Sequence, residues 1–222
     1  MRISKRLQAI SEFINDKEKI IDIGCDHALL DIYLMENRKG LKLIASDIHE
    51  GAYNSALKNI KKYEMENKIK LRLGDGLSVL KKNEVDTIII AGMGYNNIIK
   101  ILSDEEKMLN INKIVIQSNT DIVKLRKKVI TLGFKINREV LVKDKDIVYT
   151  VIEFIRGHEK YSYNEIYFGP RLMENKDDLF IEYYTKKLLK YENLLLQLPK
   201  FEIKSKMHHK KLIRIIKREL NL

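Results

Sequence analysis

Along residues 1–156, short apolar segments alternate with longer segments whose apolar residues recur at helical spacing. The short segments indicate strands covered on both faces, and the longer ones indicate amphipathic helices. Strands are expected at 19–23, 41–46, 69–73, 85–91 and 112–117. Helices are expected at 3–15, 28–36, 49–63 and 122–132. This alternation predicts an α/β fold with a parallel, doubly wound sheet.

Two further segments, 134–142 and 147–155, alternate between apolar and polar positions around the charged tetrapeptide 143–146. That pattern predicts an antiparallel hairpin that closes the sheet domain. We therefore expect a first domain over residues 1–156. In a sheet of this kind, ligands bind at the carboxyl ends of the strands.

The pattern changes after Arg156. Residues 157–174 are polar and aromatic, and a turn is expected at 168–170. Apolar and aromatic residues then recur every three or four positions from Phe180 to Leu198, where Pro199 interrupts them. A second helix is indicated by Met207, Ile213, Ile216 and Leu220. Residues 157–222 are thus expected to be an α-helical extension with a coiled-coil-like hairpin.

Glycines and carboxylates stand where four of the predicted strands end. Asp22 and Gly24 follow the first strand, Asp47 the second, Asp75 the third and Gly92 the fourth. Because the carboxyl ends of parallel strands share one edge of the sheet, these residues should lie together. A glycine lets the backbone approach a ligand, and a carboxylate after the second strand can accept hydrogen bonds from ribose hydroxyls.

The turn after the first strand carries one glycine where the dinucleotide fingerprint has three, so it offers a poor cradle for a pyrophosphate. Its carboxylates, Asp22 and Asp26, would repel phosphate and suit an amine-bearing ligand. S-adenosylmethionine has an adenosine, an ammonium and a sulfonium group but no phosphate, and is the expected cofactor. Its expected contacts are Asp22, Gly24, His27, Asp47, Ile48, Gly74, Asp75, Gly76, Ala91 and Gly92.

The loop after the fourth strand, 91–95, has small residues that would admit a flat base, with Met93 available for packing. A ring nitrogen such as adenine N1 has a free lone pair, so its methylation depends mainly on in-line positioning. Asp26 could offset the charge that develops on the ring, and Asn119 could bind a base edge, so Asp26, Asn119 and Met93 are the expected catalytic residues. Asp26, Asn119 and His27 also have purely structural interpretations. Asp26 could cap the following helix, Asn119 could form a turn, and His27 could hold the loop in place.

The distribution of charge along the chain indicates a class of binding partner. The 222 residues include 42 Lys and Arg against 31 Asp and Glu, a net charge of +11. Eight of these cations lie between Lys200 and Arg218 with one acidic residue, Glu202. Such clustering favours a polyanion such as RNA. The expected RNA-binding residues are Arg2, Lys5, Arg6, Lys204, Lys206, Lys210, Lys211 and Arg214.

Cysteine usage and hydropathy exclude other classes. The single cysteine, Cys25, rules out a disulfide framework and a cysteine-based zinc site. No apolar run approaches the roughly 20 residues that span a bilayer, and the first residues lack the apolar core of a signal peptide. We expect a cytoplasmic protein with no metal, no membrane segment and no obligate protein partner.

Taken together, these motifs resemble the bacterial tRNA methyltransferases that modify N1 of adenine 22. The similar segments are 4–7, 22–28, 74–77, 91–94, 117–119 and 168–172. The resemblance implies a Rossmann-like class I methyltransferase domain that uses S-adenosylmethionine. It also implies a C-terminal helical extension and tRNA as the substrate.

Four positions depart from the family pattern. That pattern has glycine at Tyr95, proline at Ser118, and tyrosine and proline at Leu29 and Asp31; a bulky Tyr95 would narrow the target pocket. Three alternatives stay open: a nicotinamide-dependent oxidoreductase, an RNA-binding protein with a decayed methyltransferase domain, and a methyltransferase acting on a protein or small molecule. The glycines missing from the turn after the first strand disfavour the oxidoreductase. The intact set of cofactor-side carboxylates disfavours the decayed domain. The basic tail weighs against the third.

Overall fold

A computed structural model describes residues 1–199 and 201–222, so Lys200 of the basic segment lies outside the described residues. The chain divides into two compact units, Met1–Lys160 and Tyr161–Leu222. The boundary was expected after Arg156, which is the last residue of the final strand, whereas the two units divide after Lys160. None of the helices in the described part of the chain combines the length and apolar character that crossing a membrane requires.

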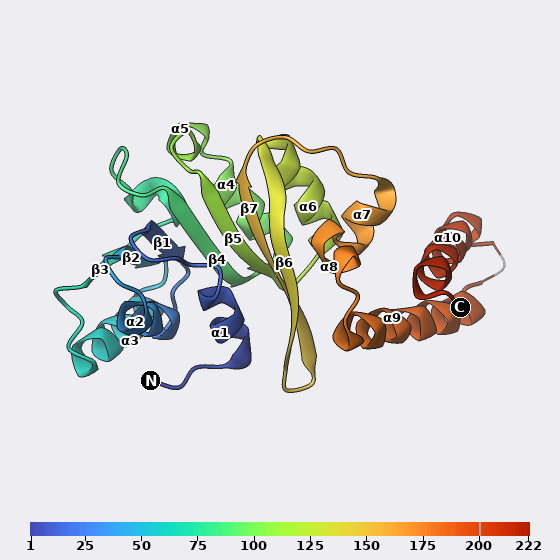
Figure 1. The fold of residues 1–222 in the computed structure, drawn as a ribbon, viewed down its shortest axis with the longest axis horizontal. Coiled ribbons are helices and arrows are strands. Elements are labelled where there is room, and N and C mark those ends of the chain that lie inside the picture. Colours follow the sequence, from blue (N-terminus) through green and yellow to red (C-terminus); the bar gives the residue numbers. More distant parts are fainter. Residues whose placement is uncertain (200) are drawn as a thin grey trace. The chain divides into compact units, whose positions relative to one another are not determined.

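The first unit is built on a seven-stranded sheet of order β3-β2-β1-β4-β5-β7-β6 (Figure 1). Strands β1 to β5 are parallel, and β7 runs antiparallel between β5 and β6. This confirms the expected α/β class with a closing antiparallel hairpin. The strands are β1 (Lys19–Ile23), β2 (Lys42–Asp47), β3 (Ile69–Leu73), β4 (Thr87–Met93), β5 (Lys113–Ser118), β6 (Phe134–Asp144) and β7 (Ile147–Arg156).

Helices cover both faces of this sheet. The structure has α1 (Lys5–Ser11), α2 (Leu29–Asn37), α3 (Glu50–Lys62), the 3₁₀ turn η1 (Gly76–Val79), α4 (Tyr95–Leu102), α5 (Glu105–Met108) and α6 (Ile122–Thr131). Helix α1 packs on α2 and α2 on α3 along one face, whereas α4 packs on α6 along the other (Figure 1). The central strands are therefore covered twice, and Ile20, Ile21 and the run Ile88–Ile90 are fully buried.

Two differences from the expected helices have clear causes. The opening helix ends at Ser11 rather than at 15, although Phe13 and Ile14 remain buried, because the apolar stripe continues into the turn that enters β1. Helix α4 was not predicted. It begins directly after Gly94 with polar residues and buries only Ile98 and Leu102, so its apolar pattern is short.

The second unit is helical: α7 (Tyr163–Phe168), α8 (Pro170–Glu174), α9 (Asp178–Gln197) and α10 (Ile203–Leu220). The turn expected at 168–170 is the junction of α7 and α8, where Gly169 has φ +99°. Helices α9 and α10 pack against each other as the expected hairpin (Figure 1). An aromatic cluster of Phe168, Phe180 and Tyr184, with ring centroids 4.6 to 6.2 Å apart, holds α7 to α9.

The inward stripe of α10 differs from the expected one. Ile216 is fully buried as predicted, but Ile213 is only partly buried and Met207 is 66% exposed. The stripe instead includes Leu212 and Glu219. The carboxylate of Glu219 is tolerated there because Lys176 Nζ lies 2.7 Å from its Oε1. A count of apolar positions cannot anticipate a buried ion pair.

Candidate active site

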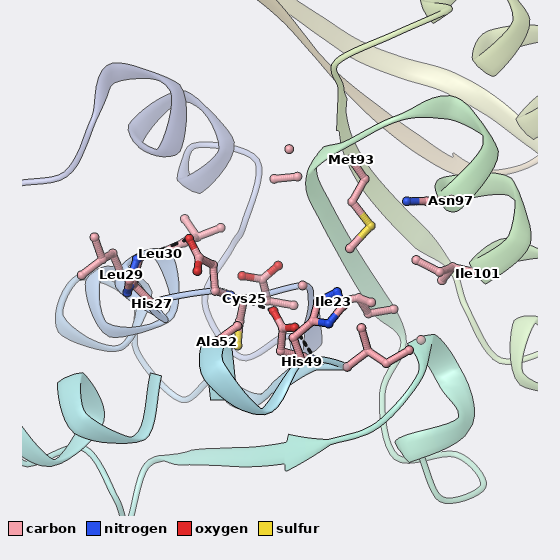
Figure 2. Close-up of a pocket in the computed structure, with 18 of the residues that line it drawn as sticks. Ile23, Cys25, His27, Leu29, Leu30, His49, Ala52, Met93, Asn97 and Ile101 are labelled. Carbon is pink, nitrogen blue, oxygen red and sulfur yellow. Dashed lines mark hydrogen bonds and ion pairs between the residues drawn. The ribbon is translucent and has the colours of Figure 1, made fainter. Parts of the chain in front are cut away.

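A cavity of about 860 Å³ opens at the carboxyl ends of β1 to β4. Its size falls within the range of small-molecule sites, roughly 300–1,000 Å³. The order of the sheet reverses between β1 and β4, so the loops that follow these strands diverge and leave a crevice. Figure 2 shows Met93 entering from the end of β4, Asn97 and Ile101 from α4, and His27, Leu29 and Leu30 from the start of α2.

All of the residues expected to contact the cofactor line this one cavity: Asp22, Gly24, His27, Asp47, Ile48, Gly74, Asp75, Gly76, Ala91 and Gly92. Asp26 and Met93, two of the three expected catalytic residues, also line it. The third, Asn119, does not belong to the lining, nor does Tyr95, which was expected to narrow the pocket. The structure therefore gathers the strand-end residues, while their roles in binding remain predictions.

Gly24 shapes the turn that follows β1. Its φ of +78° is a left-handed conformation that favours glycine. A β-carbon at this position would also collide with Cε of Met93. The turn is fixed to β2, because the N–H groups of Gly24 and Cys25 both donate to the Ser46 carbonyl, at 2.8 and 3.0 Å. The backbone angle thus favours glycine here, and any larger residue would also have to displace the end of the Met93 side chain.

Asp47 ends β2 and is only 6% exposed. Its Oδ1 accepts the His49 N–H at 2.9 Å, and its Oδ2 accepts the Asp26 N–H at 3.2 Å. These two backbone donors fix the orientation of the carboxylate and compensate part of the cost of burying it. Each oxygen keeps a second lone pair for a ligand.

Asp22 lines the cavity and is 4% exposed, and the fully buried Asp31 of α2 lies behind it. Burial raises the pKa of Asp22 to about 7; the hydrogen bond with Asp31 and the charge of Arg6 lower this pKa, and the charge of Asp47 raises it. Burial, followed by the charge of Asp22, also raises the pKa of Asp31 well above its ordinary value. The sequence offered no reason to count Asp31 among the site residues.

Asp26 stands at the mouth of the cavity with its side chain 70% exposed, and its Oδ2 lies 3.6 Å from Nε2 of His27. The N-cap position of α2 is held by Ala28, without a side-chain hydrogen bond. Asp26 therefore does not cap that helix, and the structural alternative considered for it does not apply. Its carboxylate lines the cavity, and its catalytic role stays a prediction.

Asn119 and Arg6 meet around the buried side chain of Gln117. Oε1 of Gln117 accepts from Arg6 Nη1 at 2.6 Å and from the Gly92 N–H at 3.1 Å. Nε2 of Gln117 donates to Asn119 Oδ1 at 3.0 Å, and Asn119 Nδ2 donates to the Gly92 carbonyl at 2.7 Å. Asn119 thus braces the loop after β4 from outside the cavity lining, and its contact with a base edge stays a prediction.

Arg6 was expected on an RNA-binding surface with Arg2 and Lys5. Those two side chains are exposed, but Arg6 is partly buried and lines the cavity. Its bond to Gln117 spans 111 residues of sequence, which is why sequence spacing could not place it.

Helix α4 contributes residues that the sequence reasoning missed. Asn97, Lys100 and Ile101 line the cavity, and Lys100 Nζ lies 2.9 Å from Oδ2 of Asp75. Positions three and four apart share one helical face, so a helix starting after Gly94 would have revealed them. His49 and Ala52, at the start of α3, are further lining residues that were not singled out.

The basic residues of α10 form a row. Lys206, Lys210, Arg214 and Arg218 are four positions apart and so follow one side of the helix. No ion pair recorded among the described residues engages these four, whereas the neighbouring Lys217 is held 2.8 Å from Glu192. Of the other expected RNA-binding residues, Lys204 is exposed and Lys211 lies 4.0 Å from the Tyr163 ring centroid.

Known proteins share both the sequence and the fold of this chain. Residues 20–218 match the family model TrmK, tRNA (adenine(22)-N(1))-methyltransferase. The tRNA (adenine(22)-N(1))-methyltransferase of Bacillus subtilis (strain 168) is 32% identical over 195 residues, which are 85% of this chain and 82% of that protein.

Solved structures agree with this result. The crystal structure of Streptococcus pneumoniae Sp1610, described as a candidate tRNA (m1A22) methyltransferase, has a TM-score of 0.92 at 32% identity. It covers 99% of this chain and 100% of that one. M. capricolum TrmK in complex with S-adenosyl-homocysteine has a TM-score of 0.89 at 30% identity and covers 100% and 99% of the two chains.

The match to the family model extends from β1 into the last turn of α10, so it includes both the cavity and the helical extension. The relatives are of similar length to this chain and share its fold throughout. The shared segments include the glycine turn after β1 and the glycine loop after β4, which both line the cavity. This chain belongs to the tRNA (adenine(22)-N(1))-methyltransferase family.

Proposed function

We propose that this chain transfers the methyl group of S-adenosylmethionine to N1 of adenine 22 in tRNA. The observation that carries the proposal is a single cavity into which four strand ends deliver carboxylates and glycine loops. The family match over residues 20–218 indicates that the methylated atom is N1 of adenine 22 in tRNA. The alternative of a decayed domain has little support, because the cofactor-side carboxylates are all present in one cavity.

The cavity fits S-adenosylmethionine in its charge. Asp47 presents two oriented oxygens, each with a free lone pair, and these suit the ribose hydroxyls. Asp22 is a buried carboxyl on the wall and suits the ammonium group, while Asp75 after β3 is assigned to the adenine edge. The turn holding Gly24 lacks the further glycines of a phosphate cradle. When bound, this cofactor supplies an electrophilic methyl group carried on a sulfonium.

The protein's own task is to position the adenine. N1 of adenine already has a lone pair, so no general base is required, and orientation is the main contribution. Gly92 and Met93 form the wall on the β4 side, and the bonds of Gln117 and Asn119 to Gly92 keep that wall rigid. The exposed carboxylate of Asp26 stabilises the positive charge that develops on the ring.

The tRNA is held mainly through its backbone. Lys206, Lys210, Arg214 and Arg218 repeat once per helical turn along α10, a spacing of about 6 Å, which suits contact with successive phosphates. Phosphate contacts fix register but carry little sequence information. Recognition of the target then depends on the shape of the tRNA and on an exposed base. A tRNA substrate also supports a cytoplasmic location for the protein.

The proposal is tested by methylation of a defined tRNA. The purified protein, S-adenosylmethionine and a tRNA transcript carrying A22 should yield 1-methyladenosine, detected by mass spectrometry of the nucleosides. A matched transcript with G22 is the control and should yield none. Methylation at another adenine or at a different ring atom would contradict the proposed target. Cofactor binding without any methylation of tRNA would favour a different substrate.

A further inference from the structure

Two carboxyl groups meet in the interior of the first unit, one from β1 and one from α2. Asp22 is 4% exposed and Asp31 is 0% exposed. Neither oxygen of Asp31 accepts a hydrogen bond from a donor among the residues that the structure describes. Asp22, which lines the cavity, is the side chain whose charge and hydrogen bonding act on the pKa of Asp31. Asp31 is therefore a buried carboxyl group that lacks a donor and interacts with a carboxyl group on the cavity wall.

Few other charges act on this pair. Asp22 is influenced by Asp31 from α2, by Asp47 at the end of β2 and by Arg6 from α1. Arg6 is the cation among them; its charge lowers the pKa of Asp22, and its Nη1 donates to the neutral Gln117. The thiol of Cys25, also in the turn, has its pKa raised by burial and by these three carboxylates, so it is neutral. No lysine or arginine among the described residues forms an ion pair with Asp22 or Asp31.

Two buried carboxylates in contact cannot both be ionised without a cation, because like charges in a poorly solvated site repel strongly. One of them must hold a proton. Asp31 lies deeper and does not line the cavity, whereas Asp22 does. The proton therefore belongs on Asp31, where it can form a hydrogen bond to Asp22 and where no ligand can replace it.

We propose that Asp31 is a positioning residue for the cofactor. Its carboxyl group stays protonated and donates a hydrogen bond to Asp22, which turns the Asp22 carboxylate toward the cavity to receive an ammonium group. The inference rests on the proposed function in that the ammonium belongs to S-adenosylmethionine. Asp22 itself ionises as the ammonium binds, and its proton leaves to solvent. Asp31 keeps its proton throughout.

The sign of the pH dependence follows from Asp22. Because its pKa is raised to about 7, Asp22 is protonated in acid and loses its attraction for an ammonium group. Affinity should therefore fall as the pH is lowered through about 7. Above that region affinity should level off, because Asp22 is then ionised and Asp31 remains neutral.

The test measures binding of S-adenosylhomocysteine, which has the same amino group, by calorimetry between pH 5.5 and 8 in the full-length protein. Three variants are compared. Asp22→Asn should lose the pH dependence near 7. Asp31→Asn replaces one neutral donor by another and should keep the wild-type midpoint, with affinity at pH 8 within about threefold. Asp31→Leu has no donor, so its midpoint should move upward and its affinity at pH 7 should fall.

A second readout does not depend on the ligand. Infrared difference spectra of wild type minus Asp31→Asn at pH 8 should show the C=O stretch of a protonated carboxyl group. This measurement also decides the matter if Asp31→Leu does not fold.

Several results would overturn the proposal. A midpoint that falls by more than about one pH unit in Asp31→Asn would mean that Asp31 carries a charge, since removing a charged neighbour lowers the pKa of Asp22. An unchanged pH profile in Asp31→Leu would reduce Asp31 to a packing role, as would an ionised Asp31 in the infrared spectrum. A protein that binds no S-adenosylhomocysteine at any pH would instead refute the proposed function, and Asp31 would then have no cofactor to position.

Discussion

Replacing Asp47 by alanine should weaken cofactor binding strongly while changing the fold little. Asp47 is the acceptor assigned to the ribose hydroxyls, and its side chain is 6% exposed. Leaving one buried hydroxyl without a partner costs about 1–3 kcal/mol, which corresponds to roughly 5- to 150-fold in Kd. Removing the Asp47 charge also lowers the pKa of Asp22, and this partly compensates at neutral pH. We expect an increase in Kd of roughly three- to 150-fold.

The fold should tolerate this change because the groups released are accessible. Asp47 accepts the N–H groups of Asp26 and His49, and both residues are exposed, so water can replace the carboxylate. The assay is calorimetric titration with S-adenosylhomocysteine, accompanied by thermal unfolding. Asp146→Ala is the matched control, because it removes the same charge from an exposed position beside the β6–β7 turn. It should bind like wild type.

A modified ligand can distinguish the loss of a contact between Asp47 and the ribose from a general effect of the Asp47 charge on binding. Removing a ribose hydroxyl from S-adenosylhomocysteine should weaken its binding to wild type and have little effect on Asp47→Ala, because the partner is already absent. Equal losses in the two proteins would show that Asp47 does not contact that hydroxyl. Unchanged affinity of Asp47→Ala for the intact ligand would refute the assignment altogether.

Three further predictions concern the transfer, the tRNA and the glycine turn. Asp26→Asn should lower the single-turnover rate at saturating cofactor and tRNA by at least about tenfold; a preserved rate would exclude an electrostatic role. Lys210→Glu with Arg214→Glu should weaken tRNA binding and reduce its salt slope by roughly 0.7–0.9 per lost phosphate contact, measured by filter binding; an unchanged slope would remove α10 from the interface. Gly24→Ala should weaken cofactor binding in calorimetry, because φ of +78° strains alanine and the new β-carbon displaces the Met93 methyl group into the cavity region; full binding by Gly24→Ala would contradict this.

The sheet was predictable because its strands are continuous apolar runs bounded by glycine and aspartate. Strands β1 and β3 have the expected bounds, 19–23 and 69–73, and the remaining parallel strands are shifted by only one or two residues at each end. Continuous apolar runs of this kind indicate strands that are covered on both faces of a sheet. Since a parallel sheet collects its carboxyl ends at one edge, the cofactor-side residues could also be gathered from sequence alone.

The rest of the site depends on contacts that no local pattern encodes. Arg6 reaches Gln117 across 111 residues, and Asn119 turns its amide toward the Gly92 carbonyl instead of the cavity. Lys100 pairs with Asp75 from a helix too short to be recognised. Asp31 resembles any polar residue in the first turn of a helix until the fold places it against Asp22.

The acidic cavity and the basic helix of this chain have complementary tasks. The net charge of +11 favours tRNA from any direction, so attraction alone cannot direct the right nucleotide to the methyl donor. Asp22, Asp26 and Asp47 repel phosphate from the cavity, while Lys210 and Arg214 on α10 attract it. We therefore expect a nucleotide to enter the cavity by its base, with its phosphate left outside. If these carboxylates bind the cationic cofactor as proposed, they also favour entry of the uncharged part of the substrate.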